Sequence, residues 1–197
     1  MSLPPVRVAV LTSGTGDNMS ALIDASRAAD AAFEVAVVVC NVPGAPSLAR
    51  ARDLGVEAVA VDHRPFGRDR EAHERALHAV LLDRRIEVVA LAGYMRILTP
   101  WLVAEWEGRM LNVHPSLLPK HPGLNTHARA LEAGDAEAGC TVHLVTAGVD
   151  EGPVLGQARV PVLTGDTPEA LAARVKVEEL KLYPVVLARF CRDLRRA

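Results

Sequence analysis

Short runs rich in β-branched residues alternate along the chain with segments whose apolar residues recur at helical spacing. The run FEVAVVVC, residues 33–40, is almost continuously apolar, which is typical of a strand buried on both faces. The segment 68–85 instead places charges on one side of a helix and Ala, Leu and Val on the other. This order predicts an α/β fold of Rossmann-like type, a doubly wound, mostly parallel twisted sheet with helices on both faces.

The same patterns give approximate bounds for each element. We expect strands at residues 6–11, 33–40, 56–61, 86–93, 110–114, 140–145 and 154–162. We expect helices at residues 18–30, 47–54, 68–85, 100–106, 126–134 and 166–190. The last helix should be capped by Asp166 or Thr167 and interrupted near Pro184. No internal repeat or flexible linker is visible, so residues 1–197 are expected to form a single domain.

Charge and cysteine content exclude several classes of protein. The net charge is -2, so the chain lacks the basic excess that binding to a nucleic-acid backbone requires. Three cysteines far apart, without a CxxC pair, argue against a disulfide framework or a zinc site and suit a cytoplasmic protein. The first apolar run contains Arg7 and is too short for a signal peptide, and no segment is long enough to span a membrane.

A glycine-rich turn, LTSGTGDNMS, follows the first expected strand. Glycines let backbone N–H groups approach a ligand, and the start of the next helix favours an anion. The third glycine of a dinucleotide fingerprint would fall at Met19, and Cys40-Asn41 at the end of the second strand offers no carboxylate for a ribose. The turn therefore favours a single phosphate over NAD or ATP, with an ordinary tight turn as the alternative.

A polar pair stands at the end of the fifth expected strand, in LNVHPSLLPKHPG, residues 111–123. Asn112 and His114 are two positions apart, so in an extended strand both side chains point to one face. The prolines of the following loop end the strand and stiffen the chain. An amide that donates to an oxyanion and an imidazole that donates or shuttles a proton together favour catalysis over a purely structural role.

Two further motifs are weaker when taken alone. AGYMRIL, residues 92–98, follows the fourth strand, where its backbone could bind a flat heterocycle or simply form a connection. Asp150, in the turn VDEGP, could orient His114 and favour its cationic form, or be an ordinary turn residue. His73 and His78 are expected on an exposed helical face, and no metal-binding pattern accompanies the histidines.

Two other classes of function remain open on the residues alone. A Rossmann-type NAD(P) oxidoreductase fits the sheet but not the incomplete fingerprint. A non-catalytic phosphate-binding or small-ligand module fits the turn but leaves Asn112, His114 and Asp150 without a purpose.

Taken in order, SGTGDN, AGYMRIL, LNVHPSLLPKHPG and VDEGP resemble the motifs of the folate-dependent glycinamide ribonucleotide (GAR) formyltransferases of purine synthesis. The similarity runs from about Val6 to Phe190, and NVHPSLLP is its most specific segment. The resemblance implies transfer of a formyl group from 10-formyltetrahydrofolate, as co-substrate, to the amine of GAR. A formyltransferase with another amine acceptor is the closest alternative.

The resemblance also implies roles for individual residues. It makes Asn112, His114 and Asp150 the catalytic residues. The GAR-binding residues would be Gly16, Asp17, Asn18, Met19, Ser20, Lys176 and Glu179. The folate-binding residues would be Arg70, Met95, Arg96, Ile97, Leu98, Asn112, Thr146, Ala147, Gly148, Val149 and Asp150. A ribonucleotide-binding half would cover about 1–100 and a folate-binding and catalytic half about 101–197.

Two positions depart from the family's pattern. Asp17 stands in the phosphate turn where many members have Ser, so its carboxylate should turn away, for example to cap the helix. Asn125 stands where some members have His and is given no catalytic role. We expect partners to be small-molecule substrates only, with no metal, nucleic acid or membrane, in a cytoplasmic monomer or homodimer.

Overall fold

The computed structural model describes residues 4–196 and has a central seven-stranded sheet, with strand order β3-β2-β1-β4-β5-β6-β7. The strands are β1 (Val6–Thr12), β2 (Phe33–Cys40), β3 (Ala58–Ala60), β4 (Val88–Leu91), β5 (Met110–His114), β6 (Glu137–Leu144) and β7 (Val154–Pro161). The first five run parallel, and β6 and β7 are antiparallel additions at one edge. The predicted mostly parallel, doubly wound sheet is therefore confirmed.

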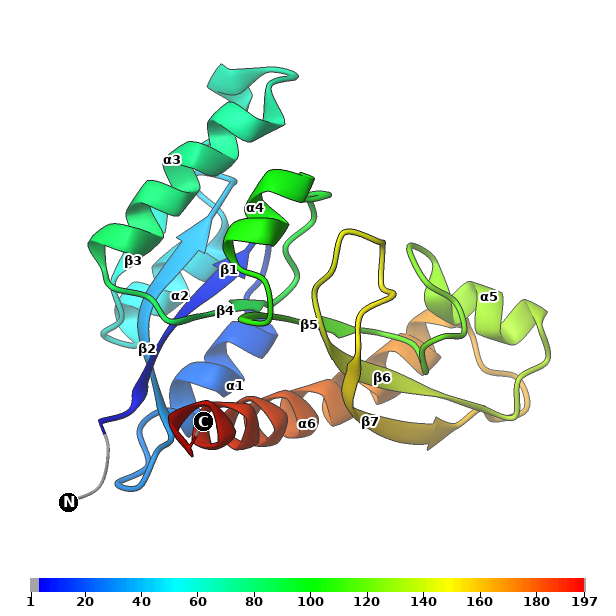
Figure 1. Ribbon diagram of the computed structural model, residues 1–197. Coiled ribbons are helices and arrows are strands. Elements are labelled where there is room, and N and C mark those ends of the chain that lie inside the picture. The colour runs from blue at the N-terminus through cyan, green and yellow to red at the C-terminus, as the bar shows by residue number, and fades with distance from the viewer. Residues whose placement is uncertain (1–3, 197) are drawn as a thin grey trace.

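Helices cover both faces of this sheet (Figure 1). They are α1 (Asp17–Ala25), α2 (Pro46–Asp53), α3 (Arg70–Asp83), α4 (Pro100–Glu105), α5 (Thr126–Glu132) and α6 (Pro168–Arg196), with a short 3-10 turn, η1 (Arg64–Phe66). α1, α2 and α6 pack on one face, around Val8 and Val10 of β1. α3 and α4 pack on the other face, around Ala9 and Leu11. Alternate residues of one buried strand thus supply both cores.

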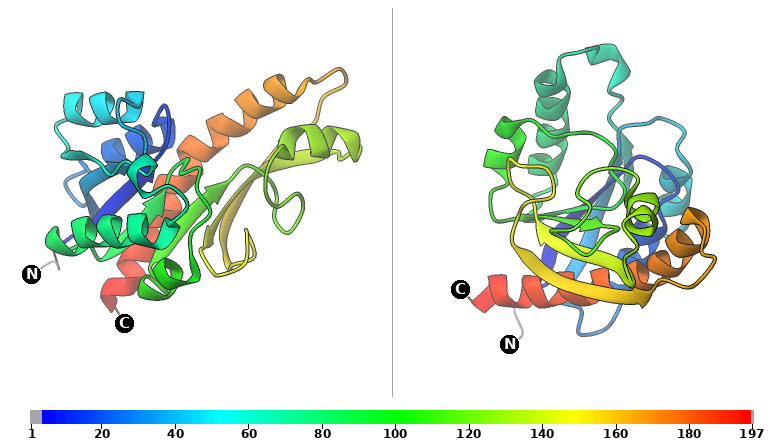
Figure 2. Two further views of the ribbon diagram at one scale, coloured as in Figure 1. Left: turned by 90° about the horizontal axis from the view of Figure 1, so that it is seen from above. Right: turned by 90° about the vertical axis from the view of Figure 1, so that its right-hand side faces the viewer.

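The expected break near Pro184 was wrong, because α6, the longest helix, is continuous at this residue. The helix begins beside α5, runs along one face of the sheet and continues through Pro184 to Arg196, as Figure 2 shows. Proline removes one backbone donor, but Tyr183 beside it is fully buried and its hydroxyl donates to the Leu111 carbonyl at 3.1 Å. Packing of this face outweighs the local preference of one residue. At its start, the Thr167 hydroxyl accepts from the Ala170 N–H, as one of the two expected caps.

Other bounds differ from the prediction by a few residues. The first helix, expected to reach residue 30, ends at Ala25, where the Ser26 hydroxyl donates to the Ile23 carbonyl and the chain turns. The expectation for His73 and His78 was wrong. His73 is buried and hydrogen-bonds the Val61 carbonyl at 2.9 Å, while His78 is half-buried beside Trp106, whose indole N–H lies 3.1 Å from it.

Candidate active site

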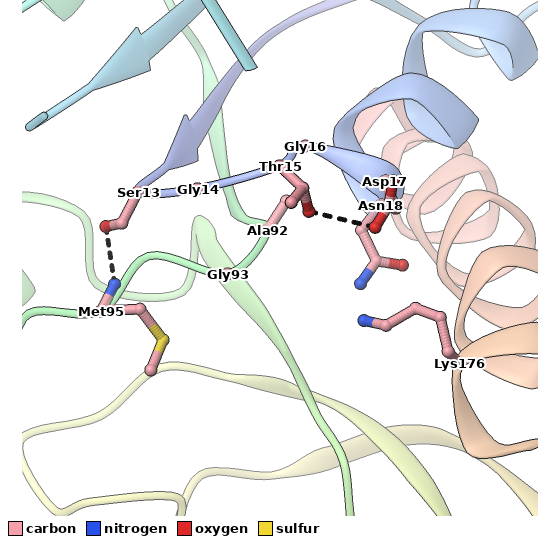
Figure 3. Close-up of a pocket in the computed structure, with 10 residues that line it drawn as sticks. All are labelled: Ser13, Gly14, Thr15, Gly16, Asp17, Asn18, Ala92, Gly93, Met95 and Lys176. Atoms are coloured by element: carbon pink, nitrogen blue, oxygen red, sulfur yellow. Dashed lines mark hydrogen bonds between the residues drawn. The ribbon is translucent and has the colours of Figure 1, made fainter. Parts of the chain in front are cut away.

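The first pocket opens at the carboxyl ends of β1 and β4, where the chain order of the sheet reverses. Connections from these two neighbouring strands diverge there, which leaves a crevice between them. The pocket is lined by Ser13, Gly14, Thr15, Gly16, Asp17, Asn18, Ala92, Gly93, Met95 and Lys176 (Figure 3). The glycine-rich turn therefore lies where an α/β sheet binds ligands, next to the amino end of α1.

Side chains and sterics fix the shape of this turn. Gly16 has a positive φ of 82°, and a Cβ there would come within 2.8 Å of Ser47, so only glycine fits. The Ser13 hydroxyl donates to Asn41 at 2.6 Å and accepts from the Met95 N–H at 2.8 Å, which ties the turn to the loop after β4. The amides of the first α1 turn are thereby held toward the pocket.

Asp17 is held by an ion pair and does not cap α1. Its carboxylate accepts from Arg50 of α2 at 2.7 Å and from the Thr15 hydroxyl at 3.0 Å. Gly16 is the N-cap residue, with no side-chain capping bond, so the expectation that Asp17 caps the helix was wrong. The Arg50 guanidinium lowers the pKa of Asp17, and its charge offsets this carboxylate in the glycine-rich turn.

Among the other residues predicted to bind GAR, Lys176 lines the first pocket, whereas the side chains of Met19 and Ser20 do not. Lys176 of α6 reaches the pocket, and its ammonium also pairs with the buried Glu179 carboxylate. Met19 is fully buried in the core, and the Ser20 hydroxyl donates to the Gly16 carbonyl at 3.1 Å. Neither of these two side chains lines the pocket, and the Ser20 backbone N–H donates to the Gly16 carbonyl at 2.9 Å, so it is not available to a ligand.

A second pocket lies beyond β4 and β5 and contains most of the residues predicted to bind folate. It is lined by Leu91, Tyr94, Arg96, Ile97, Leu98, Val103, Asn112, His143, Val145, Thr146, Ala147, Gly148, Val149 and Asp150. Met95 lines the first pocket instead. Arg70 is absent from the lining of the second pocket, and its guanidinium lies 3.4 Å from the Ile97 carbonyl.

Asn112, His114 and Asp150 come together at the edge of the second pocket. β5 carries Asn112 and His114, and the turn between β6 and β7 carries Asp150. His114 Nδ1 lies 3.3 Å from Asp150 Oδ2, and the Gly123 N–H donates to the same oxygen at 2.9 Å. His114 Nε2 lies 3.0 Å from the His121 carbonyl, so both ring nitrogens face acceptors. A ring in this environment donates through both nitrogens when it carries two protons.

His143 is a site residue that the sequence analysis missed. β6 pairs with β5 so that His143 stands opposite Asn112, with the ring nitrogen Nε2 3.3 Å from the Asn112 amide. The same nitrogen lies 3.6 Å from Asp150 Oδ1, and Nδ1 lies 2.9 Å from the Leu144 carbonyl. The signal in the sequence was a lone histidine within the apolar run CTVHLV, but its partner depends on strand register, which the sequence does not show.

Electrostatics keep the Asp150 carboxyl ionised. Burial alone would raise the pKa of Asp150, but the His143 ring, the Gly123 N–H and the charge of His114 outweigh it and hold this pKa below its usual value. The carboxylate is therefore the fixed negative charge around which the two imidazoles are arranged. This arrangement can place donors around a developing oxyanion and can move a proton.

Neighbouring residues take other parts. Asn125 has a left-handed φ of 56° at the start of α5 and makes no side-chain capping bond. Cys140 is buried, and burial raises the pKa of its thiol to about 12, which does not favour a nucleophile.

Within residues 4–196, no group of three or more His, Cys, Asp or Glu side chains is arranged to hold a metal ion. The same part of the chain has no helix with the length and apolar character to cross a membrane.

Solved structures with this fold are similar over almost the whole chain. Phosphoribosylglycinamide formyltransferase from Brucella melitensis is 48% identical, with a TM-score of 0.91 over 95% of this chain and 96% of that one. Glycinamide ribonucleotide transformylase 1 from Symbiobacterium toebii is 44% identical, with a TM-score of 0.92 over 96% of this chain and 89% of that one.

Comparison of sequences agrees with the comparison of structures. Phosphoribosylglycinamide formyltransferase of Escherichia coli K12 is 44% identical over 94% of this chain and 87% of its own length. The trifunctional purine biosynthetic protein adenosine-3 of Drosophila melanogaster is 45% identical over 92% of this chain, which spans only 14% of that larger protein. The sequence profile of the formyl transferase family matches residues 6–187, and the chain belongs to this family.

Proposed function

We propose that this enzyme transfers the formyl group of 10-formyltetrahydrofolate to the amine of glycinamide ribonucleotide. The products are formylglycinamide ribonucleotide and tetrahydrofolate, a step of purine (IMP) biosynthesis. The observation that carries the proposal is the cluster of Asn112, His114 and Asp150 at the edge of the second pocket, which shares the loop after β4 with the first pocket. One pocket has the backbone and lysine expected of a phosphate site, and the other has partly apolar walls, as expected of a folate site.

The chemistry follows from the groups present. The amine of GAR attacks the formyl carbon, and negative charge develops on the formyl oxygen. The Asn112 amide and the His114 imidazolium donate to this oxygen, while Asp150 holds His114 in place. The bond between carbon and N10 then breaks, N10 takes up a proton as tetrahydrofolate leaves, and the attacking nitrogen loses one. The proposed reaction needs no metal.

A backbone carbonyl marks where the formyl oxygen could bind. His114 Nε2 lies 3.0 Å from the carbonyl oxygen of His121, in the proline-rich loop after β5. The His121 carbonyl accepts from the same nitrogen that would donate to the formyl oxygen during the reaction. We therefore propose that the formyl oxygen replaces the His121 carbonyl on His114 when both substrates are bound.

The wider setting of the enzyme is part of the proposal. We propose one domain over residues 1–197, with phosphate binding mainly in the first half and catalysis mainly in the second. Lys176 is an exception, because α6 brings it to the phosphate pocket. Small molecules are the proposed partners, in a cytoplasmic monomer or homodimer.

The test is an assay of tetrahydrofolate release with GAR and with other amines. We expect release only with 10-formyltetrahydrofolate and GAR together, and formylated GAR in equal amount. If tetrahydrofolate were released with a higher kcat/KM for a different amine, that amine would be the acceptor in place of GAR. This outcome would favour the alternative formyltransferase. Binding of NADH, followed by its fluorescence, would instead favour an oxidoreductase.

A further inference from the structure

The loop after β5 reaches the catalytic pair through its backbone. In residues 121–123 of this loop, the His121 carbonyl lies 3.0 Å from His114 Nε2. Two positions later, the Gly123 N–H donates to Asp150 Oδ2 at 2.9 Å. One short segment therefore contacts both members of the pair, whose nitrogen and oxygen lie 3.3 Å apart. A shift of this segment would change the hydrogen-bond geometry at both catalytic residues.

The side chains that hold this segment come from α5 and from the turn after it. His121 Nε2 lies 2.7 Å from Oδ2 of Asp135, and the two side chains are only 15% and 13% exposed. Arg129 of α5 donates to the Pro122 carbonyl. Lys120 donates to the other oxygen of Asp135 at 2.7 Å. Lys120 and then His121 lower the pKa of Asp135, so its carboxylate is a charged and therefore strong acceptor.

The earlier part of the loop has a different support. Thr141 of β6 donates through its hydroxyl to the Ser116 carbonyl at 2.7 Å and accepts from the Leu118 N–H at 3.0 Å. By contrast, the hydrogen bonds that residues 121–123 make within the described chain run only to the catalytic pair, to α5 and to the turn after α5. The sheet thus fixes the beginning of the loop, while α5 and its turn fix the segment beside the catalytic pair.

His121 has a backbone conformation that needs support from its surroundings. Its φ of 52° lies in the left-handed region, which is unfavourable for a residue with a Cβ. Such a conformation persists where neighbouring contacts hold it. His121 contacts Asp135 with its ring and His114 with its carbonyl, so this one residue links the end of α5 to the catalytic imidazole.

We propose that Asp135 is a positioning residue, whose carboxylate holds the His121 ring and thereby keeps the loop against His114 and Asp150. Until the formyl oxygen takes its place, the His121 carbonyl keeps the His114 ring oriented for donation. The backbone N–H two residues later keeps the Asp150 carboxylate facing the same ring. The effect on turnover rests on the proposed function, whereas the effect on the geometry of His114 requires no substrate.

The test removes each side of the contact between Asp135 and His121. Asp135→Ala removes the acceptor and releases Lys120 as well, whereas His121→Leu removes only the donor. We expect each variant to lower kcat about tenfold and to change KM for GAR and KM for the folate less than about threefold, because misplaced catalytic groups slow the chemical step. The double variant should lose no more than either single variant, since both changes break one contact. His121→Gln keeps a donor at similar reach and should lower kcat less than about threefold.

Glu132→Ala is the matched control, because Glu132 is exposed on the last turn of α5 and its replacement removes the same charge. It should keep kcat and both KM values of the wild type. The second readout is proton–nitrogen NMR of the histidine rings in the enzyme without substrates, with the signals of His114 assigned by their loss in His114→Ala. These signals should shift in Asp135→Ala and His121→Leu and stay in place in Glu132→Ala.

Wild-type kcat and unshifted His114 signals in both Asp135→Ala and His121→Leu would overturn the inference. It also fails if His121→Gln loses as much activity as His121→Leu, or if both KM values rise together with a lower melting temperature, as purely structural damage predicts. Should Asp135→Ala not fold, the comparison of the two His121 variants decides. If the wild type does not formylate GAR but the His114 signals respond as expected, the proposed function fails while the positioning of His114 by Asp135 stands.

Discussion

Replacing Asp150 by Asn tests the centre of the proposed site with little disturbance of the backbone. Asp150 has a left-handed φ of 56°, a conformation that Asn tolerates better than most residues. The substitution keeps the size of the side chain but replaces one carboxylate oxygen by an NH₂ group. Three neighbours face the carboxylate, namely His114 at 3.3 Å, His143 at 3.6 Å and the Gly123 N–H at 2.9 Å.

The expected loss follows from these contacts. A neutral amide neither holds the imidazolium of His114 nor accepts from all three neighbours, so kcat should fall about 10²–10⁴-fold. Both KM values should change little, because the interaction acts on the transition state. Hydrogen bonds to a charged group contribute about 1.5–3 kcal/mol each, and Asn keeps part of them. We therefore expect the free energy of unfolding to fall by about 1–2 kcal/mol.

The dependence on pH gives a second readout. The folded-state pKa of Asp150 lies below the unfolded value of about 3.9, so its stabilising contribution is complete above that pH. The contribution is lost as pH falls through the folded-state pKa. The difference in unfolding free energy between the wild type and Asp150→Asn should therefore be constant near neutral pH and shrink in acid.

The assays are initial rates of tetrahydrofolate release across pH and denaturant unfolding at several pH values. Glu87→Gln is the control, because Glu87 also has a lowered pKa, caused mainly by Arg195, but lies at the opposite end of the sheet. This control should lose stability while keeping kcat. The reasoning fails if Asp150→Asn keeps kcat within about threefold with the pH profile of the wild type, or if Glu87→Gln loses as much activity.

Three further predictions concern the two pockets and the catalytic pair. Asn112→Ala or His114→Ala should lower kcat about 10²–10³-fold without unfolding the protein, and near-normal turnover of either variant would remove its catalytic assignment. Asp17→Ser should lower KM for GAR about two- to fivefold, because the substitution removes a carboxylate near the proposed phosphate site and leaves the charge of Arg50 unpaired. The effect should be smaller at high salt. An equal or higher KM for GAR would show that Asp17 does not oppose the phosphate. Met95→Ala should raise KM mainly for GAR and Ile97→Ala mainly for the folate, as separate titrations of the two substrates would show; the same response from both would contradict the division into two pockets.

Much of the fold could be predicted because local patterns and packing agree. The run 33–40 is a strand with the predicted bounds, since it is almost continuously apolar, and 110–114 also has the predicted bounds. Pro184 shows the limit of this reasoning. Its residue type predicts a break, but the burial of neighbouring Tyr183 against the sheet keeps α6 continuous.

The site could be predicted only as far as its residues lie on one element or carry a known motif. Asn112 and His114 share a face of β5, which follows from strand geometry alone. The roles of His143 and Arg50 depend on contacts across 31 and 33 positions of sequence, which no local pattern specifies. Arg50 also explains how Asp17 is tolerated in the proposed phosphate turn, where the sequence suggested a helix cap as one way for the carboxylate to turn away.

The loop after β4 separates the two pockets and links their arrangement to the proposed chemistry. Successive residues of this loop face different sides, since Gly93 and Met95 line the first pocket while Tyr94 and Arg96 line the second. The loop is therefore a partition that a ligand in either pocket would contact. For a group to pass between two bound substrates, their reacting groups must meet at a point that the loop does not separate. β5 emerges beside β4 in the sheet and carries Asn112 to the edge of the second pocket, so the strand order itself places the amide donor where the two substrates would come together.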